Sequence, residues 1–170
     1  MSLLLRKVSN KNRWEGLGED DWIPPGEMQA DLLGDLNTSD NELSLWRIEN
    51  DRSNVDRIIA AIAARRGKLD RVDFLLFDTE VLESLGIECR PHRGDSADPG
   101  INDLWHVDAC ELTASGLLSL AKEVKDRSEK SRILRQKVRE LIQRSVSAGY
   151  IPREHITEKV LSEIDHETTS

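Results

Sequence analysis

The sequence lacks the features that identify several classes of protein. Cysteine occurs twice in 170 residues, at positions 89 and 110, without the close spacing of a metal motif. Two thiols in a chain of this size fit the reducing cytoplasm better than a disulfide-stabilised scaffold. No apolar stretch approaches the roughly 18 residues of a membrane span, and the three leucines after Ser2 are too short a run for a secretory signal. We therefore expect a cytoplasmic protein without a membrane partner.

Familiar catalytic motifs are also missing. The chain has no phosphate-binding loop with Gly-Lys-Ser/Thr and no dinucleotide-binding glycine fingerprint. Ser115 lacks the two flanking glycines of a nucleophile elbow. These absences leave enzymatic activity an open question and favour a function without catalysis.

Charged residues are abundant and unevenly distributed. They make up 33% of the chain, above the roughly 25% of typical globular proteins, and the formal net charge is -8. Residues 15–56 hold twelve acids and two bases, whereas residues 122–144 hold nine bases and four acids. The acidic segment would repel a phosphate backbone, so nucleic acid is not the expected partner. A basic protein or a bound cation suits this segment better.

The segment 72–78, Val-Asp-Phe-Leu-Leu-Phe-Asp, carries the strongest structural signal. Its nearly continuous apolar character is typical of a strand covered on both faces. Strand-like patterns at 43–49 and 104–109 flank it, with helical patterns between them. This alternation predicts an α/β fold with a small, three- to four-stranded, mostly parallel sheet and flanking helices. Segment 72–78 is expected at its centre, next to the other two strands.

The other segments are expected outside the sheet. Residues 1–26 have an irregular pattern, and residues 86–103 have the proline and glycine content of a long loop. Thr113 is expected to cap a helix, and helical periodicity continues to Gly149. That stretch predicts either one long helix or two helices with a kink at 128–131.

The chain therefore divides into two parts. Residues 1–112 are expected to form an acidic N-terminal segment and the α/β core. Residues 113–170 are expected to form a helical C-terminal third that packs on, or extends from, the same domain.

Carboxylates near the ends of the predicted strands are the candidate catalytic groups. If the strands are parallel, Asp78 and Asp108 converge at one edge of the sheet, where they could hold Mg²⁺ or Mn²⁺ for phosphoester hydrolysis. His106 and Asp108 lie two positions apart, so both project from the same strand face. The preceding loop contributes His92, with arginines that could bind an anion. The alternatives are that Asp78 caps the next helix and that His106 and Asp108 face water at a sheet edge.

Two groups of side chains are candidates for binding a partner. Trp14 and Trp22 flank an acidic stretch, and tryptophan is favoured at interface hot spots. Arg132, Arg135 and Arg139 belong to the basic segment 122–144, which could contact an acidic surface or phosphates. No aromatic residue interleaves with these bases, so base stacking has no support, and a solvated helix face is the simpler alternative.

Three functions remain in competition. The charge pattern favours an acidic protein-binding module, such as a regulatory, immunity-like or accessory subunit, with a basic partner or a second copy in a homodimer. The first alternative is a metal-dependent phosphoester hydrolase that uses Asp78, His106 and Asp108. The second is a nucleic-acid-associated protein that uses residues 122–144. Only the hydrolase requires a cofactor, Mg²⁺ or Mn²⁺.

Overall fold

The chain folds around one six-stranded sheet. The computed structural model describes residues 2–16, 23, 24 and 26–165. In chain order the elements are β1 (Leu3–Val8), α1 (Lys11–Trp14), α2 (Asp31–Asp35), β2 (Leu43–Ile48), α3 (Val55–Ala64), β3 (Val72–Asp78), α4 (Glu80–Ser84), β4 (Cys89–Pro91), α5 (Pro99–Asn102), β5 (His106–Ala109), α6 (Ala114–Arg127), β6 (Glu129–Ile133), α7 (Arg135–Ser147), a short 3-10 helix (Arg153–His155) and α8 (Glu158–Asp165).

The sheet is antiparallel throughout, so the prediction of a small, mostly parallel sheet is wrong. The strand order is β4-β5-β2-β1-β3-β6, and every neighbouring pair is antiparallel. The strands β2 and β3, joined through α3, run in the same direction, as the alternating pattern implied. They are not neighbours, because β1 lies between them and pairs with both.

Three strands, β1, β4 and β6, come from segments that were expected to be irregular, a loop or helical. In β1, Arg6 and Lys7 interrupt the apolar pattern, although Leu4, Leu5 and Val8 are buried. The polar strand β6 replaces the predicted helical kink, and it forms a sheet edge beside β3. The predicted loop 86–103 contains β4 and α5. Short or polar strands of this kind have little periodicity, and long-range pairing decides their conformation.

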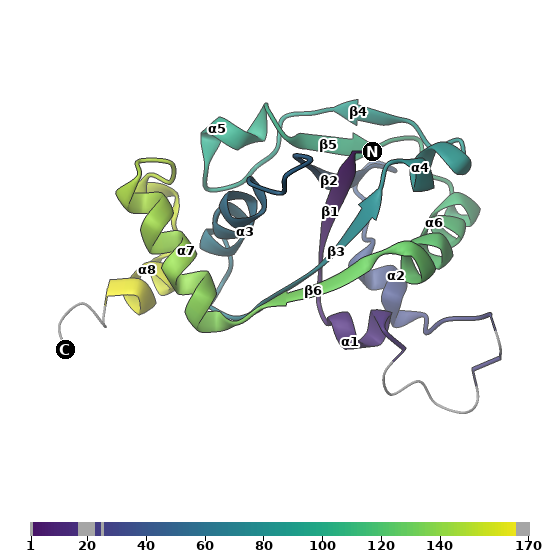
Figure 1. Cartoon of the computed structure of the whole chain (residues 1–170), viewed down its shortest axis with the longest axis horizontal. Coiled ribbons are helices and arrows are strands. Elements are labelled where there is room, and N and C mark those ends of the chain that lie inside the picture. The colour runs from purple at the N-terminus through teal and green to yellow at the C-terminus, as the bar shows by residue number, and fades with distance from the viewer. Residues whose placement is uncertain (1, 17–22, 25, 166–170) are drawn as a thin grey trace.

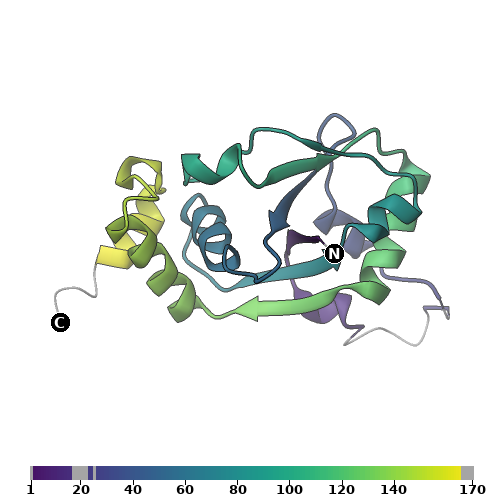
Figure 2. The same cartoon turned by 45° about the horizontal axis from the view of Figure 1, so that its top comes forward.

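Helices cover both faces of the sheet. Figure 1 shows α3, α7 and α8 on one side and α2, α4 and α6 on the other, and Figure 2 shows the same layers from another angle. The strand β3 supplies both cores, because Phe74 and Leu76 point into one and Leu75 and Phe77 into the other. The sequence-based prediction that segment 72–78 is buried on both faces is confirmed.

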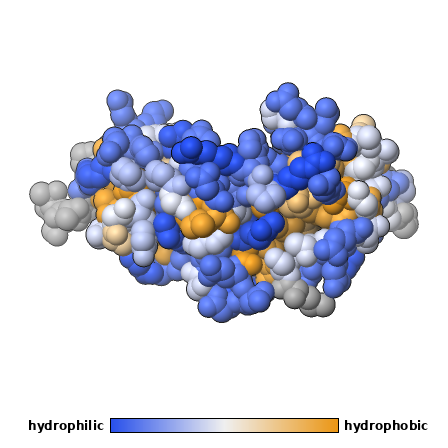
Figure 3. Space-filling model, turned by 90° about the horizontal axis from the view of Figure 1, so that it is seen from above, coloured by the Kyte–Doolittle hydropathy of each residue, from blue (hydrophilic) through white to orange (hydrophobic). Residues whose placement is uncertain are grey.

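The surface of one face is mostly hydrophilic. Figure 3 shows separate hydrophobic areas among the hydrophilic side chains of that face, without one broad apolar patch. Among the described residues, no helix has both the length and the apolar character needed to cross a membrane.

Candidate functional site

Polar side chains gather on one face of β2 and β5. Ser44 lies opposite Asp108 and Trp46 lies opposite His106 in the antiparallel register, so all four project to the same side. His92 follows β4, and its main-chain N–H donates to the carbonyl oxygen of His106 at 3.5 Å. Pairing between strands therefore assembles a site from three separate segments of the chain.

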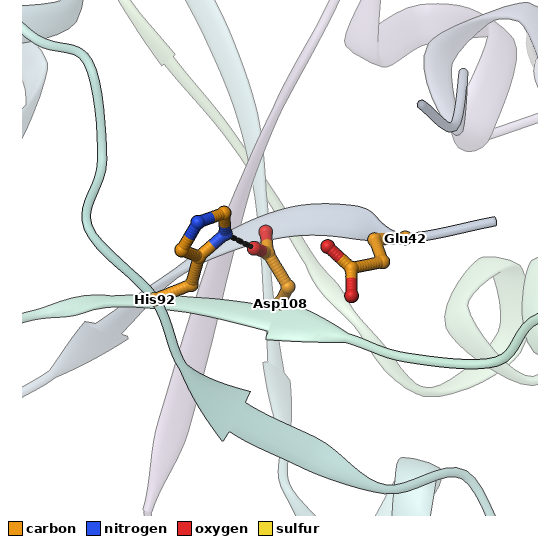
Figure 4. A group of neighbouring side chains, drawn as sticks. All are labelled: Glu42, His92 and Asp108. Carbon is orange, nitrogen blue, oxygen red and sulfur yellow. Dashed lines mark hydrogen bonds and ion pairs between the residues drawn. The ribbon is translucent and has the colours of Figure 1, made fainter. Parts of the chain in front are cut away.

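Glu42, His92 and Asp108 form a cluster with the donor atoms of a metal site. One carboxylate or imidazole atom from each lies within 4.8 Å of the others. Figure 4 shows the Asp108 carboxylate between the His92 ring and the Glu42 carboxylate, with His92 Nδ1 in contact with Asp108 Oδ2. The Asp108 side chain is 7% exposed, whereas that of His92 is 63% exposed. The cluster is thus buried at Asp108 and open to solvent at His92, from which side a cation could enter.

His106 is buried beside this cluster in a fixed orientation. Its Nδ1 lies 2.9 Å from the main-chain oxygen of His92, and its Nε2 lies 2.5 Å from Ser44 Oγ. A carbonyl oxygen only accepts hydrogen bonds, so Nδ1 carries a proton, and in the neutral ring Nε2 then accepts the hydroxyl proton of Ser44. This pairing resembles that of a nucleophile with its base. Nε2 is also 3.8 Å from Asp108 Oδ1, which joins the pair to the cluster.

Gly94 lets the 92–98 loop pass directly over the His106 ring. A Cβ atom at position 94 would lie 2.9 Å from His106 Cγ, closer than real Cβ contacts allow. The edge of the His106 ring also packs against Trp46, with ring centroids 4.9 Å apart. These contacts restrict the ring to one position.

A cleft of about 270 Å³ opens onto the cluster; we name it the acidic cleft. It contains one arginine, Arg93, which pairs with Asp103 at 3.8 Å. Its walls also include Ser44 and His106. The cleft carries four carboxylates, those of Asp40, Glu42, Asp95 and Asp108. This excess of negative charge favours a cation.

The two nearby thiols, those of Cys89 and Cys110, do not belong to this cluster of donor atoms. Burial raises the pKa of Cys110, and the neighbouring Glu42 carboxylate raises it further. Burial raises the pKa of Cys89 to about 11. The oxygen and imidazole donors of Glu42, His92 and Asp108 are therefore the candidate ligand set.

The structure brings together two of the three predicted catalytic residues. His106 and Asp108 share one strand face as expected, and both are buried in a strand that lies between β2 and β4. Asp78 lies at the carboxyl end of β3, which β1 and β2 separate from β5. Because β5 runs antiparallel to β2, its carboxyl end points away from that of β3. The Asp78 carboxylate instead accepts from Glu80 N at 3.0 Å, at the start of α4.

The candidate partner-binding side chains make contacts within the chain. Trp14 is 1% exposed, and its Nε1 donates to Asp35 at 2.9 Å; Trp22 lies outside the described residues. Arg132 pairs with Asp73 at 2.7 Å, Arg135 pairs with Glu163 at 2.6 Å, and Arg139 is buried. The segment 122–144 is divided among α6, β6 and α7 rather than forming one basic helix. A partner-binding role for these residues stays a prediction.

Glu42 and Ser44 were not singled out from the sequence. The Leu43-Ser44-Leu45 alternation places Ser44 on the face away from its apolar neighbours, which is a signal for its direction but not for its partner. Glu42 precedes the strand and shows no pattern. Only the pairing of β2 with β5 reveals what both residues face.

Comparisons with known proteins found no relative of this chain. No protein-family model, curated protein or solved structure matches the chain.

Proposed function

We propose that the protein is a metal-dependent hydrolase, with phosphoesters as the favoured substrate class. The observation that carries this proposal is the Glu42, His92 and Asp108 cluster at the base of the acidic cleft. Carboxylate oxygens and an imidazole nitrogen are ligand types that bind Zn²⁺ and Mn²⁺ in proteins. Asp78 has no part in this site.

The donor set selects among the divalent cations. Imidazole suits Zn²⁺ and carboxylates suit Mn²⁺, so these two are the preferred ions, whereas Mg²⁺ favours an all-oxygen site. When bound, such an ion polarises the substrate and lowers the pKa of a water molecule. The open side of the cluster, next to exposed His92, leaves room for water and substrate.

His106 and Ser44 are suited to proton transfer beside the cation. The His92 carbonyl accepts from Nδ1–H, so in the neutral ring Nε2 is the nitrogen that can take a proton. In the present geometry Nε2 accepts from Ser44 Oγ, which lies on the wall of the acidic cleft. Ser44 therefore either relays the proton from the attacking water or positions the substrate.

Direct titration tests the metal site. We expect Mn²⁺ and Zn²⁺ to bind the metal-free protein with one ion per chain in isothermal titration calorimetry, and Asp108→Asn or Glu42→Gln to weaken binding at least about tenfold. The matched control is Asp103→Asn, an equal charge change at an exposed carboxylate outside the cluster. Wild-type protein that binds neither ion, or Asp108→Asn protein that binds like wild type, would contradict the proposal.

The Ser44–His106 contact favours a second candidate, a metal-independent serine hydrolase. A panel of p-nitrophenyl phosphate, bis(p-nitrophenyl) phosphate and p-nitrophenyl acetate separates the two functions. Loss of turnover in EDTA with recovery on adding Mn²⁺ or Zn²⁺ supports the metal-dependent enzyme. Turnover that survives EDTA and disappears in Ser44→Ala assigns the serine mechanism instead.

The two free cysteines, one buried and one half-buried, support a reducing compartment. The cytoplasm is thus the proposed location.

A further inference from the structure

A second cavity, of about 390 Å³, adjoins the acidic cleft, and its lining carries three basic side chains against two carboxylates, those of Asp35 and Asp95. The two cavities share Ser44, Asp95 and His106, so the serine–histidine pair lies between them. Arg6, Lys7 and Arg65 line the second cavity, which we name the cationic pocket. A substrate lying across the Ser44–His106 pair would therefore meet a cation site on one side and basic side chains on the other.

Lys7 is the basic side chain of this pocket that has no hydrogen-bond or ion-pair partner among the residues that the structure describes. It is nevertheless half-buried. Asp35, whose charge attracts Lys7, uses its two carboxylate oxygens to accept from Ser9 N at 2.7 Å and from Trp14 Nε1 at 2.9 Å. Burial lowers the pKa of Lys7, and the charges of Arg66 and Arg6 lower it further, against a smaller attraction from Asp35. An anion would supply the counter-charge that is missing here.

Arg6 adds a second positive charge, which the charge of the Asp35 carboxylate partly offsets. Its guanidinium donates to the main-chain oxygens of Asp35 at 2.9 Å, Ser44 at 2.8 Å and Asn37 at 3.4 Å. These neutral acceptors fix the group between α2 and β2 and leave its charge in place. Arg65 does pair with Asp95, at 2.9 Å, but the Asp95 side chain is 85% exposed and a bound anion could replace it.

We infer that the cationic pocket binds a phosphate group of the substrate, with Lys7 as its main contact. This inference rests on the proposed function, because it places the reacting bond at the Glu42, His92 and Asp108 cluster. A phosphoester with a second phosphate would have one group at the cation and the other at Lys7. Phosphate matches the pocket because it offers several acceptor oxygens to lysine and arginine donors.

Pyrophosphate is the probe for this subsite. We expect calorimetry to detect its binding to wild-type protein in EDTA, and Lys7→Gln to weaken that binding about tenfold, the effect of one charge-assisted hydrogen bond. Lys68→Gln is the matched control, because Lys68 is an exposed lysine that pairs with Asp70. Lys7→Arg keeps the charge and should retain most of the binding. Equal affinity in Lys7→Gln and wild type, or no wild-type binding, would overturn the inference.

Metal titrations of the same variants separate this inference from the proposed function. Lys7→Gln should bind Mn²⁺ or Zn²⁺ like wild type, whereas Asp108→Asn should lose the metal and still bind pyrophosphate. If pyrophosphate does not bind at Lys7, the metal titrations still test the metal site. If no metal binds, the pyrophosphate titrations still test the phosphate subsite. Unfolding temperature checks that each variant is folded; Lys7→Gln removes a repelled, unpaired charge and should not lower it.

Discussion

At the scale of single residues, Asp73 is the clearest buried charge outside the site. Its side chain is 1% exposed and accepts from Arg132 Nε at 2.7 Å and Nη2 at 2.8 Å, while Lys11 N donates to it at 2.9 Å. Arg132 lies directly opposite Asp73 in the pairing of β3 with β6. This ion pair attaches the polar edge strand β6 and the start of α1 to β3.

Stability should depend on pH through this carboxylate. Burial raises the pKa of Asp73, but the Arg132 hydrogen bonds, the Lys11 N–H and the charges of Arg132 and Arg71 together bring it below its ordinary value. A depressed folded-state pKa contributes stability above the unfolded pKa of about 4, and that stability is lost as pH falls through the folded value.

We expect Asp73→Asn to lower the unfolding free energy by about 2 kcal/mol at pH 7, because Arg132 loses its counter-charge. The decrease in stability below about pH 5 should also become less steep in the variant. Urea unfolding at several pH values measures both effects. Asp70→Asn is the control, since Asp70 is a nearby carboxylate that is far more exposed. If the unfolding free energy of Asp73→Asn changed with pH in parallel with that of wild type, the prediction would be contradicted.

At the scale of elements, the 92–98 loop that carries His92 is held in place by Asp98. This carboxylate is buried, accepts from Gly100 N at 2.9 Å as the cap of α5, and pairs with Arg57 of α3 at 2.5 Å. The Arg57 guanidinium lies over the rings of Trp105 and Tyr150. One side chain thus connects the loop, α5 and α3.

We expect Asp98→Ala to lower the unfolding free energy by about 3 kcal/mol, since it removes both a cap and a buried ion pair. Asp98→Asn keeps an acceptor for Gly100 N, so it should lower the unfolding free energy less than Asp98→Ala does. Both changes should also weaken metal binding, in the same order, because they loosen the segment that positions His92. Chemical denaturation and metal titration of the two variants test this order, and equal effects of the two changes on stability would contradict it.

At the scale of the whole molecule, two cores share one sheet. Ile59 on α3 belongs to the core that includes α7 and α8, and Leu75 on β3 belongs to the core that includes α2, α4 and α6. Both side chains are fully buried. Because β1, β2 and β3 contribute to both cores, loss of packing on one face should affect the other.

We therefore expect Ile59→Ala and Leu75→Ala each to lower the unfolding free energy by about 2–5 kcal/mol. Each variant should unfold in a single transition at a lower temperature than wild type. In a chain of this size that is a fall of roughly 3 °C for each kcal/mol. Differential scanning calorimetry measures it. Ile62→Ala on α3 is a milder control, because Ile62 is only partly buried. Two separate transitions, of which each variant shifts only one, would contradict a shared core.

Local patterns predicted part of the site. The two-residue spacing of His106 and Asp108 put them on one strand face, since side chains alternate along a strand. Asp78 was grouped with them because a parallel sheet was assumed. The direction of β5 is set by its pairing with β2, and no local pattern in either strand reports that direction.

The sequence by itself determined those elements whose signal lies within a few neighbouring residues. The apolar run of β3, the apolar stripe of α3, and Thr113, whose hydroxyl accepts from Gly116 N at the start of α6, are of this kind. Only the tertiary structure decided that β1 separates β2 from β3, and that Glu42, His92 and Asp108 meet. Those outcomes depend on hydrogen bonds and side-chain packing between segments far apart in the chain. Residues 42, 92 and 108 therefore become neighbours only when β2, β4 and β5 have found their register.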